Sequence, residues 1–122
     1  MAGDAVICGT VEILQKSLRQ HDILARYGGE EFIIYLPDTE EPEALAIAKQ
    51  LKSGIAANKM TLDNVDHPVS VTISMGLLSI SDFNAGQPKD ASAYLNDLFK
   101  NVDKALYAAK HQGRNRIVSV RQ

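Results

Sequence analysis

Two carboxylates directly follow two glycines in the stretch RYGGEEFIIYLP, residues 26–37. Adjacent acids repel each other, and a strand places neighbouring side chains on opposite faces of its sheet. We therefore do not expect Glu30 and Glu31 to form a tight carboxylate pair. One of them can face a metal ion or substrate, while the other points to the opposite face of the sheet. A divalent cation would compensate this charge, since Mg²⁺ prefers hard oxygen ligands. The alternative is an exposed hairpin tip with solvated acids.

Two further pairs of charged residues could carry chemistry, and each also has an ordinary structural explanation. Lys110 and Arg114 lie near the C-terminus, where an ammonium and a guanidinium would both suit a phosphate. Their alternative role is that of helix-end cations, which the helix dipole favours. Arg19 and Asp22 form an RxxD pattern in RQHD, and the usual explanation of such a pattern is a surface ion pair.

A hairpin is predicted to carry the acidic stretch. DILARY (22–27) and EEFIIYLP (30–37) are rich in strand-forming residues and are separated by GG. This spacing predicts a two-residue turn between two antiparallel strands. Gly28 and Gly29 can take the positive φ values that such a turn requires.

Two helices are predicted around this hairpin. Apolar residues recur at helical spacing over residues 4–20, where Asp4 is a candidate N-terminal cap or first-turn acid. A second helix is predicted within residues 38–59, with Thr39 or Asp38 as its cap. An incomplete apolar stripe along it is formed by Leu45, Ala48, Leu51, Lys52 and Ile55.

The second half of the chain adds a strand, a helix and a strand. VSVTISMG (69–76) alternates apolar and polar residues, and residues 81–92 have the composition of a loop. Residues 93–113 form the clearest helical pattern, with Gly113 as its C-terminal stop. One apolar face of this helix is formed by Leu95, Leu98, Val102, Leu106 and Ala109. RIVSV (116–120) is a final strand. The order α-β-β-α-β-α-β predicts an α+β fold, a sheet with helices packed on it.

Composition limits the class of protein. A chain of 122 residues suits a single domain, residues 1–122, and 45% hydrophobic with 23% charged residues is typical of a soluble globular protein. The net charge of −2 gives no bulk attraction to nucleic acid or to an anionic membrane. The single cysteine excludes an intrachain disulfide, and no apolar stretch is long enough to span a membrane. We expect a cytoplasmic protein.

Three motifs in the same order resemble the GGDEF family, the diguanylate cyclase domains. They are RYGGEEF, SVTISMG and DKALYAAKHQGRN, so the signature has the GGEEF form. The resemblance runs from Gly3 and Asp4 to the last strand. It implies a fold related to the palm of nucleotide cyclases and polymerases, with a ferredoxin-like sheet. It also implies that two GTP molecules are condensed to cyclic di-GMP with release of pyrophosphate, assisted by Mg²⁺ or Mn²⁺.

The resemblance assigns catalytic roles to the acidic stretch. Glu30 matches the metal ligand and candidate base, and Glu31 is a second acid beside it. Gly28 and Gly29 leave room for a nucleotide close to the backbone. These residue types fit the reaction, because divalent metals neutralise phosphate charge and lower the pKa of the attacking 3′-hydroxyl.

The resemblance also assigns substrate-binding roles. Asp4 matches an acid that contacts the guanine edge, and Lys110 and Arg114 match a basic pair near the triphosphate. RxxD at this offset from the glycines resembles the family's product-inhibition site for cyclic di-GMP, so Arg19 would bind phosphate or stack on guanine while Asp22 would accept hydrogen bonds from guanine.

The family pattern includes, before Gly3, segments that this chain does not contain. They are a first strand that ends in a metal-binding Asp, then a Phe-Lys pair, an Asn-Asp pair and a Gly-His. We therefore expect the sheet to lack its usual first central strand. Either the second hairpin strand pairs directly with VSVTISMG, or another chain covers the two exposed edges.

The family segments that this chain does not contain limit the activity that we expect of it. Because Glu30 alone is a poor Mg²⁺ site, we expect a fragment of a catalytic domain that has no cyclase activity by itself. Its expected partners are GTP, cyclic di-GMP and a second subunit in a homodimer, with no nucleic acid, no direct membrane contact and an upstream sensor domain in the parent protein. The alternatives are a degenerate receptor that binds cyclic di-GMP through Arg19 and Asp22, or a plain α+β interaction domain.

Overall fold

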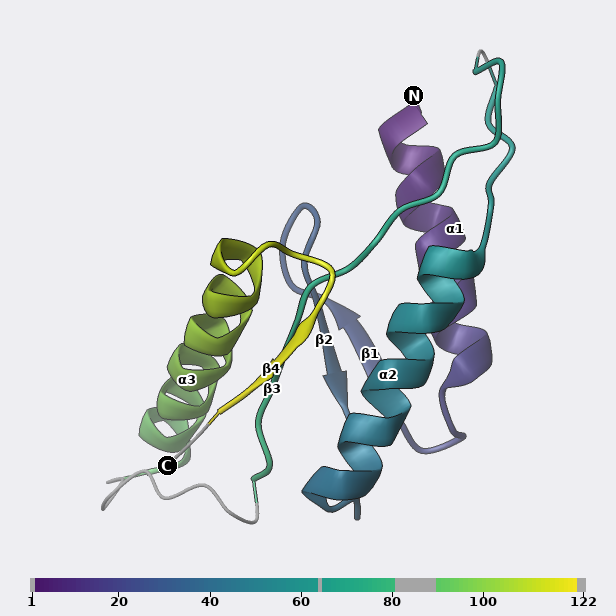
Figure 1. Cartoon of the computed structure of the whole chain (residues 1–122). Coiled ribbons are helices and arrows are strands. Elements are labelled where there is room, and N and C mark those ends of the chain that lie inside the picture. The colour runs from purple at the N-terminus through teal and green to yellow at the C-terminus, as the bar shows by residue number, and fades with distance from the viewer. Residues whose placement is uncertain (1, 64, 81–89, 121–122) are drawn as a thin grey trace. The chain divides into compact units, whose positions relative to one another are not determined.

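The computed structural model describes residues 2–63, 65–80 and 90–120, with side chains from residue 5 onward. The order of elements matches the prediction and confirms the α+β class (Figure 1). In chain order these elements are α1 (Ala2–Ser17), β1 (Ile23–Arg26), β2 (Phe32–Tyr35), α2 (Glu41–Ala57), β3 (Met75–Leu77), α3 (Ala91–His111) and β4 (Ile117–Ser119).

The chain divides into two compact units. The first unit comprises Met1–Thr39 and Gln50–Thr72, and the second comprises Glu40–Lys49 and Ile73–Gln122. Helix α2 therefore begins in the second unit and ends in the first.

The first unit has an apolar core supplied by α1, α2 and the segment after α2. The side chains of Leu14, Leu51, Ile55 and Met60 are no more than 7% exposed. Leu51 and Ile55 are one helical turn apart, so they lie on one face of α2 and bury the stripe that the spacing predicts. Their burial confirms the amphipathic character of this helix.

Strands β1 and β2 form an antiparallel hairpin in the first unit. Ile23 lies opposite Tyr35, and Arg26 lies opposite Phe32. The strands are shorter than predicted, because β2 begins at Phe32 rather than at the glutamates. The apolar residues enter the ladder, while the charged residues before them stay outside it.

The second unit pairs β3 with β4 in parallel and packs α3 against both strands (Figure 1). The closest approach is at Gly76, where an added Cβ would lie 2.6 Å from the Leu106 nitrogen and 2.7 Å from the Val102 oxygen. No side chain fits this space, so only glycine lets the backbone of β3 approach the helix this closely.

Helix α3 has defined ends. Asp90 is its N-cap, and the carboxylate accepts a hydrogen bond of 2.8 Å from the Ala93 N–H. Gly113, at φ 120°, confirms the predicted C-terminal stop. Leu95, however, is 48% exposed instead of buried, and Ala105 joins Leu98 and Ala109 in the core.

The predicted strand over residues 69–76 is mostly wrong. Only its last residues enter β3, while Val69 forms an isolated antiparallel bridge with Met60. Residues 69–73 still alternate between half-buried and exposed, as the apolar–polar pattern requires. Alternation fixes which side chains turn inward, but a strand also needs a hydrogen-bonded neighbour along its length.

In the described part of the chain, no ladder joins the hairpin to this segment. Strand β2 pairs with β1, and β3 pairs with β4, without a ladder between β2 and β3 among the residues described here. Residues 81–89 of the predicted loop lie outside the described residues.

The predicted cap of α2 is also wrong. The helix begins at Glu41, later than a cap at Asp38 or Thr39 would allow. Asp38 has φ 51°, and the Thr39 hydroxyl donates to the Pro37 carbonyl at 2.8 Å. Both residues therefore shape the connection before the helix.

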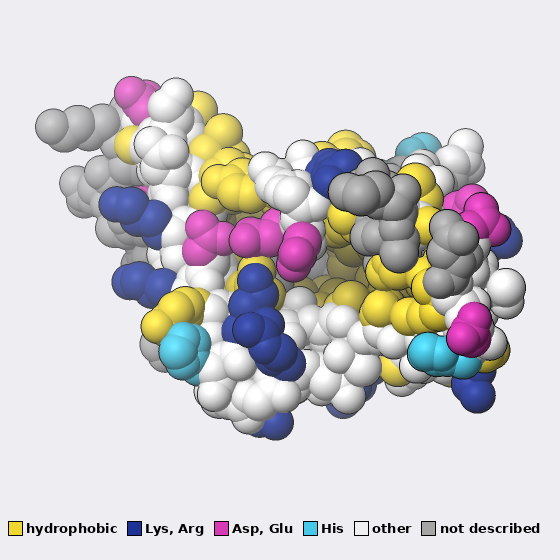
Figure 2. Space-filling model, turned by 90° about the horizontal axis from the view of Figure 1, so that it is seen from above, with side chains coloured by type: hydrophobic (Ala, Val, Ile, Leu, Met, Phe, Trp, Pro, Cys, Tyr) yellow, Lys and Arg dark blue, Asp and Glu magenta, His cyan; other side chains and the backbone are white. Residues whose placement is uncertain are grey.

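The surface agrees with the small net charge. On the face that Figure 2 displays, acidic, basic and hydrophobic side chains all reach the surface. In the part of the chain that the structure describes, no helix is long and apolar enough to cross a bilayer.

Gly76→Ala is expected to destabilise the protein by about 1–3 kcal/mol, because the new methyl group meets helix backbone that cannot rotate away. Chemical denaturation measures the change in the free energy of unfolding. The matched control is Gly54→Ala on α2, where the nearest atom to the added Cβ is Ile13 Cγ2 at 3.9 Å. That variant is expected to gain about 0.5–1 kcal/mol from helix propensity. Equal effects of the two substitutions would contradict the close approach at Gly76.

Candidate functional site

The acidic stretch forms a turn at the end of the β1–β2 hairpin (Figure 1). The Tyr27 and Gly28 N–H groups both donate to the Glu31 carbonyl, at 2.8 and 3.2 Å. Residues 28–30 therefore form the tip, instead of the two-residue glycine turn that the sequence predicts. The tip is longer because both glutamates stay outside the strands.

Neither glycine of the tip has the positive φ value that was expected, since Gly113 is the positive-φ glycine of the described chain. Packing does not require them either. A Cβ on Gly29 would meet nothing within 4 Å, and one on Gly28 would meet only the Glu31 Cβ, at 3.9 Å. The protein's own contacts thus leave open space at both glycines.

Arg26, the last residue of β1, holds the main chain of this tip. Its Nε donates to the Gly28 carbonyl at 3.1 Å, and its Nη2 donates to the Gly29 carbonyl at 2.6 Å. One guanidinium therefore binds two successive carbonyls. The sequence gives no signal for this role, because a lone arginine at a strand end belongs to no spacing pattern.

The two glutamates differ in exposure. Glu30 is exposed at the tip and Glu31 is half-buried. Their expected placement on opposite strand faces does not apply, because neither is in a strand. Within the described residues, no three His, Cys, Asp or Glu side chains gather to hold a metal ion. The Glu30 carboxylate is a suitable hard ligand for Mg²⁺, but it does not form a complete site.

Arg19 and Asp22 face each other directly after α1. The Arg19 Nη2 lies 2.9 Å from the Asp22 Oδ1, and the Arg19 Nε donates to both carboxylate oxygens. The Arg19 backbone N–H also donates to Oδ2 at 2.8 Å. The guanidinium donates to the Pro37 carbonyl and the Thr39 hydroxyl as well, which links the end of α1 to the connection before α2.

This pair changes the acidity of Asp22. Hydrogen bonds from the Arg19 side chain hold the pKa of the carboxyl below its usual value. The Arg19 backbone N–H and positive charge act in the same direction, and together they outweigh partial burial, which acts against ionisation. Asp22 therefore stays an anion to lower pH than an isolated aspartate.

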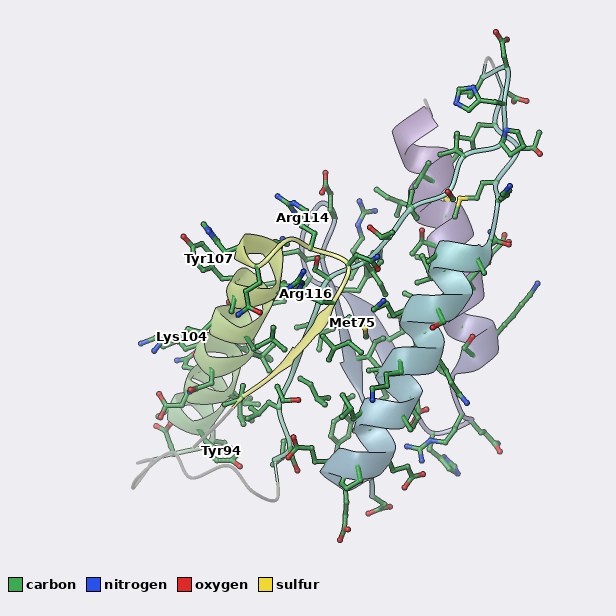
Figure 3. The ribbon with its side chains drawn as sticks, in the orientation of Figure 1. Met75, Tyr94, Lys104, Tyr107, Arg114 and Arg116 are labelled. Atoms are coloured by element: carbon green, nitrogen blue, oxygen red, sulfur yellow. The ribbon has the colours of Figure 1, made fainter. Side chains whose placement is uncertain are left out.

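The predicted phosphate-binding cations lie where α3 ends and turns toward β4. Lys110 is half-buried in the last turn of α3. Arg114 is exposed in the connection that follows (Figure 3). Gly113, Arg114 and Asn115 all have positive φ, at 120°, 62° and 48°. This left-handed run ends the helix, so the two cations are not neighbours on one helix face.

Three contacts hold the basic turn, residues 113–116, in place. The Arg114 N–H donates to the Ala109 carbonyl at 2.9 Å, and the Asn115 N–H donates to the Ser74 hydroxyl at 3.2 Å. Arg116 turns back toward the same loop, where its Nε donates to the Arg114 carbonyl at 3.1 Å (Figure 3). The contact between Asn115 and Ser74 joins residues that are far apart in sequence, so spacing alone could not identify it.

Asp4 lies in the first turn of α1 and does not cap it, because the helix extends back to Ala2. Its side chain lies outside the described residues. Of the predicted sites, the acidic tip and the RxxD pair belong to the first unit, and the basic turn belongs to the second.

Comparisons with known proteins point to one family. A family model described as "Diguanylate cyclase, GGDEF domain" matches residues 1–116. The probable diguanylate cyclase DgcT of Escherichia coli strain K12 is 39% identical over 118 residues, which cover 95% of this chain and 24% of that protein. The chain spans about a quarter of the length of curated relatives such as this one.

Solved structures agree on the fold. The active GGEEF domain of a diguanylate cyclase from Vibrio cholerae has a TM-score of 0.68 at 28% identity, over 98% of this chain and 69% of that one. The GGDEF domain of DgcB from Caulobacter crescentus, in complex with cyclic di-GMP, has a TM-score of 0.80 at 22% identity, over 98% and 65% of the two chains. Because the family model covers nearly the whole sequence, the chain belongs to the GGDEF domain family of diguanylate cyclases.

Proposed function

We propose that this chain is part of a diguanylate cyclase catalytic domain, which condenses two GTP molecules to cyclic di-GMP and pyrophosphate. The observation that best supports this assignment is the open space around the two glycines of the GGEEF tip. Neither φ nor packing demands glycine there, so close approach of a ligand to the backbone explains both residues. Family membership supplies the reaction.

The residues of the tip and the basic turn have complementary roles in this reaction. Glu30, at the exposed tip, supplies a carboxylate oxygen to a metal ion and is the candidate acceptor of the proton from the attacking 3′-hydroxyl. Glu31 is the second acid beside it. Lys110 and Arg114 bind triphosphate oxygens as a point charge and a planar fork. Asp4 accepts hydrogen bonds from the guanine edge.

The metal must be held jointly. Mg²⁺ or Mn²⁺ neutralises phosphate charge when it is bound, and Mg²⁺ in proteins commonly takes one or two carboxylates plus substrate phosphates and water. The described residues offer Glu30 and no cluster of three ligands. The remaining protein ligand would come from the strand that the family pattern includes before Gly3. We therefore infer that the chain by itself binds nucleotide but does not cyclise it.

Strand segments without a hydrogen-bonded neighbour also support the inference that the chain by itself does not cyclise nucleotide. Residues 69–73 have the alternating burial of a strand without a ladder, and β2 pairs on the β1 side only among the residues described. A central strand between β2 and β3 would satisfy both edges. In the complete enzyme, two such domains would meet as a homodimer with one GTP per subunit, under an upstream sensor domain.

RxxD is the proposed product-inhibition site for cyclic di-GMP. The pair is preorganised by its own hydrogen bonds, so a ligand must share or displace Asp22 at the Arg19 guanidinium. Arginine would then bind phosphate or stack on guanine. A chain that binds cyclic di-GMP here but never binds GTP would instead be a degenerate receptor.

The wild-type chain is expected to bind GTP in the presence of Mg²⁺ and to form no cyclic di-GMP. Glu30→Gln is expected to weaken this binding by about tenfold, because it removes the metal-binding charge. Calorimetry measures the affinity, and chromatography of the incubated nucleotide detects product. The control is Glu12→Gln, an exposed acid on α1 with the same charge change. Equal affinities in all three proteins would contradict the role of Glu30, and product formation by the wild-type chain would contradict its inactivity.

Arg19→Ala is expected to weaken cyclic di-GMP binding by at least about tenfold, because the charged donor of the RxxD pair is lost. Calorimetric titration of the chain with cyclic di-GMP provides the measurement. Lys16→Ala removes a cation in the last turn of α1 and should leave the affinity unchanged. If both variants bind as the wild type does, RxxD is only a surface ion pair.

Asp22→Asn tests the electrostatic part of the pair. Folding lowers the Asp22 pKa, so the ionised carboxylate contributes stability that is present above the ordinary aspartate value of about 3.9 and is lost as the pH falls through the lower folded value. The difference in free energy of unfolding between wild type and variant should be constant from about pH 6 to 8 and should shrink below about pH 4. Denaturant titrations at each pH measure it. A gap that persists down to about pH 2 would contradict this interpretation.

A further inference from the structure

The Arg26 guanidinium fixes the direction of two peptide groups at the hairpin tip. It binds the Gly28 and Gly29 carbonyls, at 3.1 and 2.6 Å. A trans peptide is planar, with its carbonyl and the following N–H pointing in opposite directions, and the chain has no cis peptide among its described residues. The N–H groups of Gly29 and Glu30 are therefore directed away from the guanidinium.

These two N–H groups are available to a ligand. Among the described residues, no acceptor receives a hydrogen bond from the backbone N–H of Gly29 or of Glu30. The space around Gly29 is open, since an added Cβ would contact nothing within 4 Å. Successive N–H groups without an acceptor in an exposed turn are suited to an anion, such as a phosphate oxygen.

Without Arg26, little else would hold these peptide groups in this orientation. The remaining hydrogen bonds of the turn converge on the Glu31 carbonyl and come from Tyr27 and Gly28, before the two peptide groups in question. The Gly28–Gly29 peptide rotates at low cost, because neither residue has a Cβ to restrict φ and ψ, and Gly29 gives the next peptide the same freedom on one side. Rotation would point a carbonyl at the ligand in place of an N–H. Charge-assisted hydrogen bonds are about twice as strong as neutral ones, so the guanidinium opposes this rotation.

We propose that Arg26 is a positioning residue, which orients the Gly29 and Glu30 N–H groups of the signature turn toward a phosphate oxygen of the nucleotide. This role depends on the planar guanidinium, whose Nε and Nη2 donate to two carbonyls at once, and not on positive charge alone. It rests on the proposed function for the identity of the ligand. The orientation itself is a property of the ligand-free chain.

The test compares the wild-type chain with Arg26→Ala, Arg26→Lys and Lys59→Ala. The last variant removes an exposed cation of the same unit. Circular dichroism first shows that each variant is folded. Amide resonances of Gly29 and Glu30 are then recorded without ligand, and calorimetry gives the Kd for GTP with Mg²⁺.

In the ligand-free chain, Arg26→Ala and Arg26→Lys should both shift the Gly29 and Glu30 amide resonances, and Lys59→Ala should not. Arg26→Ala should bind GTP about tenfold more weakly, and Arg26→Lys at least about fivefold more weakly, since an ammonium keeps the charge but lacks the fork. Lys59→Ala should bind within about twofold of the wild type.

Two results would overturn the proposal. Unchanged Gly29 and Glu30 resonances in Arg26→Ala would show that the guanidinium does not orient the turn. Wild-type affinity in Arg26→Lys would show that charge alone suffices. A failure of the proposed function has a different signature, because the wild-type chain would then bind no GTP while the resonances of the ligand-free variants still report the orientation.

Discussion

The register of the β1–β2 hairpin is the constraint on which the acidic site depends. Because Arg26 lies opposite Phe32, the next residues bring two N–H groups to the Glu31 carbonyl and leave a short glycine-rich tip. This register places Glu30 in solvent and puts the Arg26 guanidinium within reach of the tip carbonyls. A slip of one residue would turn every side chain of β2 to the other face and would draw a glutamate into the ladder.

The basic turn depends on a second close contact. Helix α3 approaches β3 until Gly76 meets helix backbone, and this contact positions the end of the helix relative to the β3–β4 pair. The left-handed run that begins at Gly113 then reverses the chain direction and presents Arg114. Non-glycine residues with positive φ carry some strain, which the hydrogen bonds from Asn115 to Ser74 and from Arg116 to the turn help to offset.

An arginine bound to main-chain carbonyls occurs at both turns. Arg26 binds two carbonyls of the acidic tip, and Arg116 binds a carbonyl of the basic turn. A guanidinium suits this task, because its planar array of donors reaches neighbouring carbonyls without requiring a regular ladder. Each contact orders its turn locally, because it fixes the direction of peptide groups in a segment that has no regular ladder.

The sequence by itself determined the order of the elements, the stripe on α2, the stop at Gly113 and the family. Each is a local property, set by apolar period, by glycine's access to positive φ or by motif order. The sequence did not determine the length of the glycine tip, the ends of the strand after residue 69 or the exposure of Leu95. These depend on which backbone groups find partners across the fold, and that is decided by tertiary packing. The contacts of Arg26 and Arg116 are short in sequence, but the sequence did not determine them either, because a guanidinium can reach many acceptors and only the folded backbone selects among them.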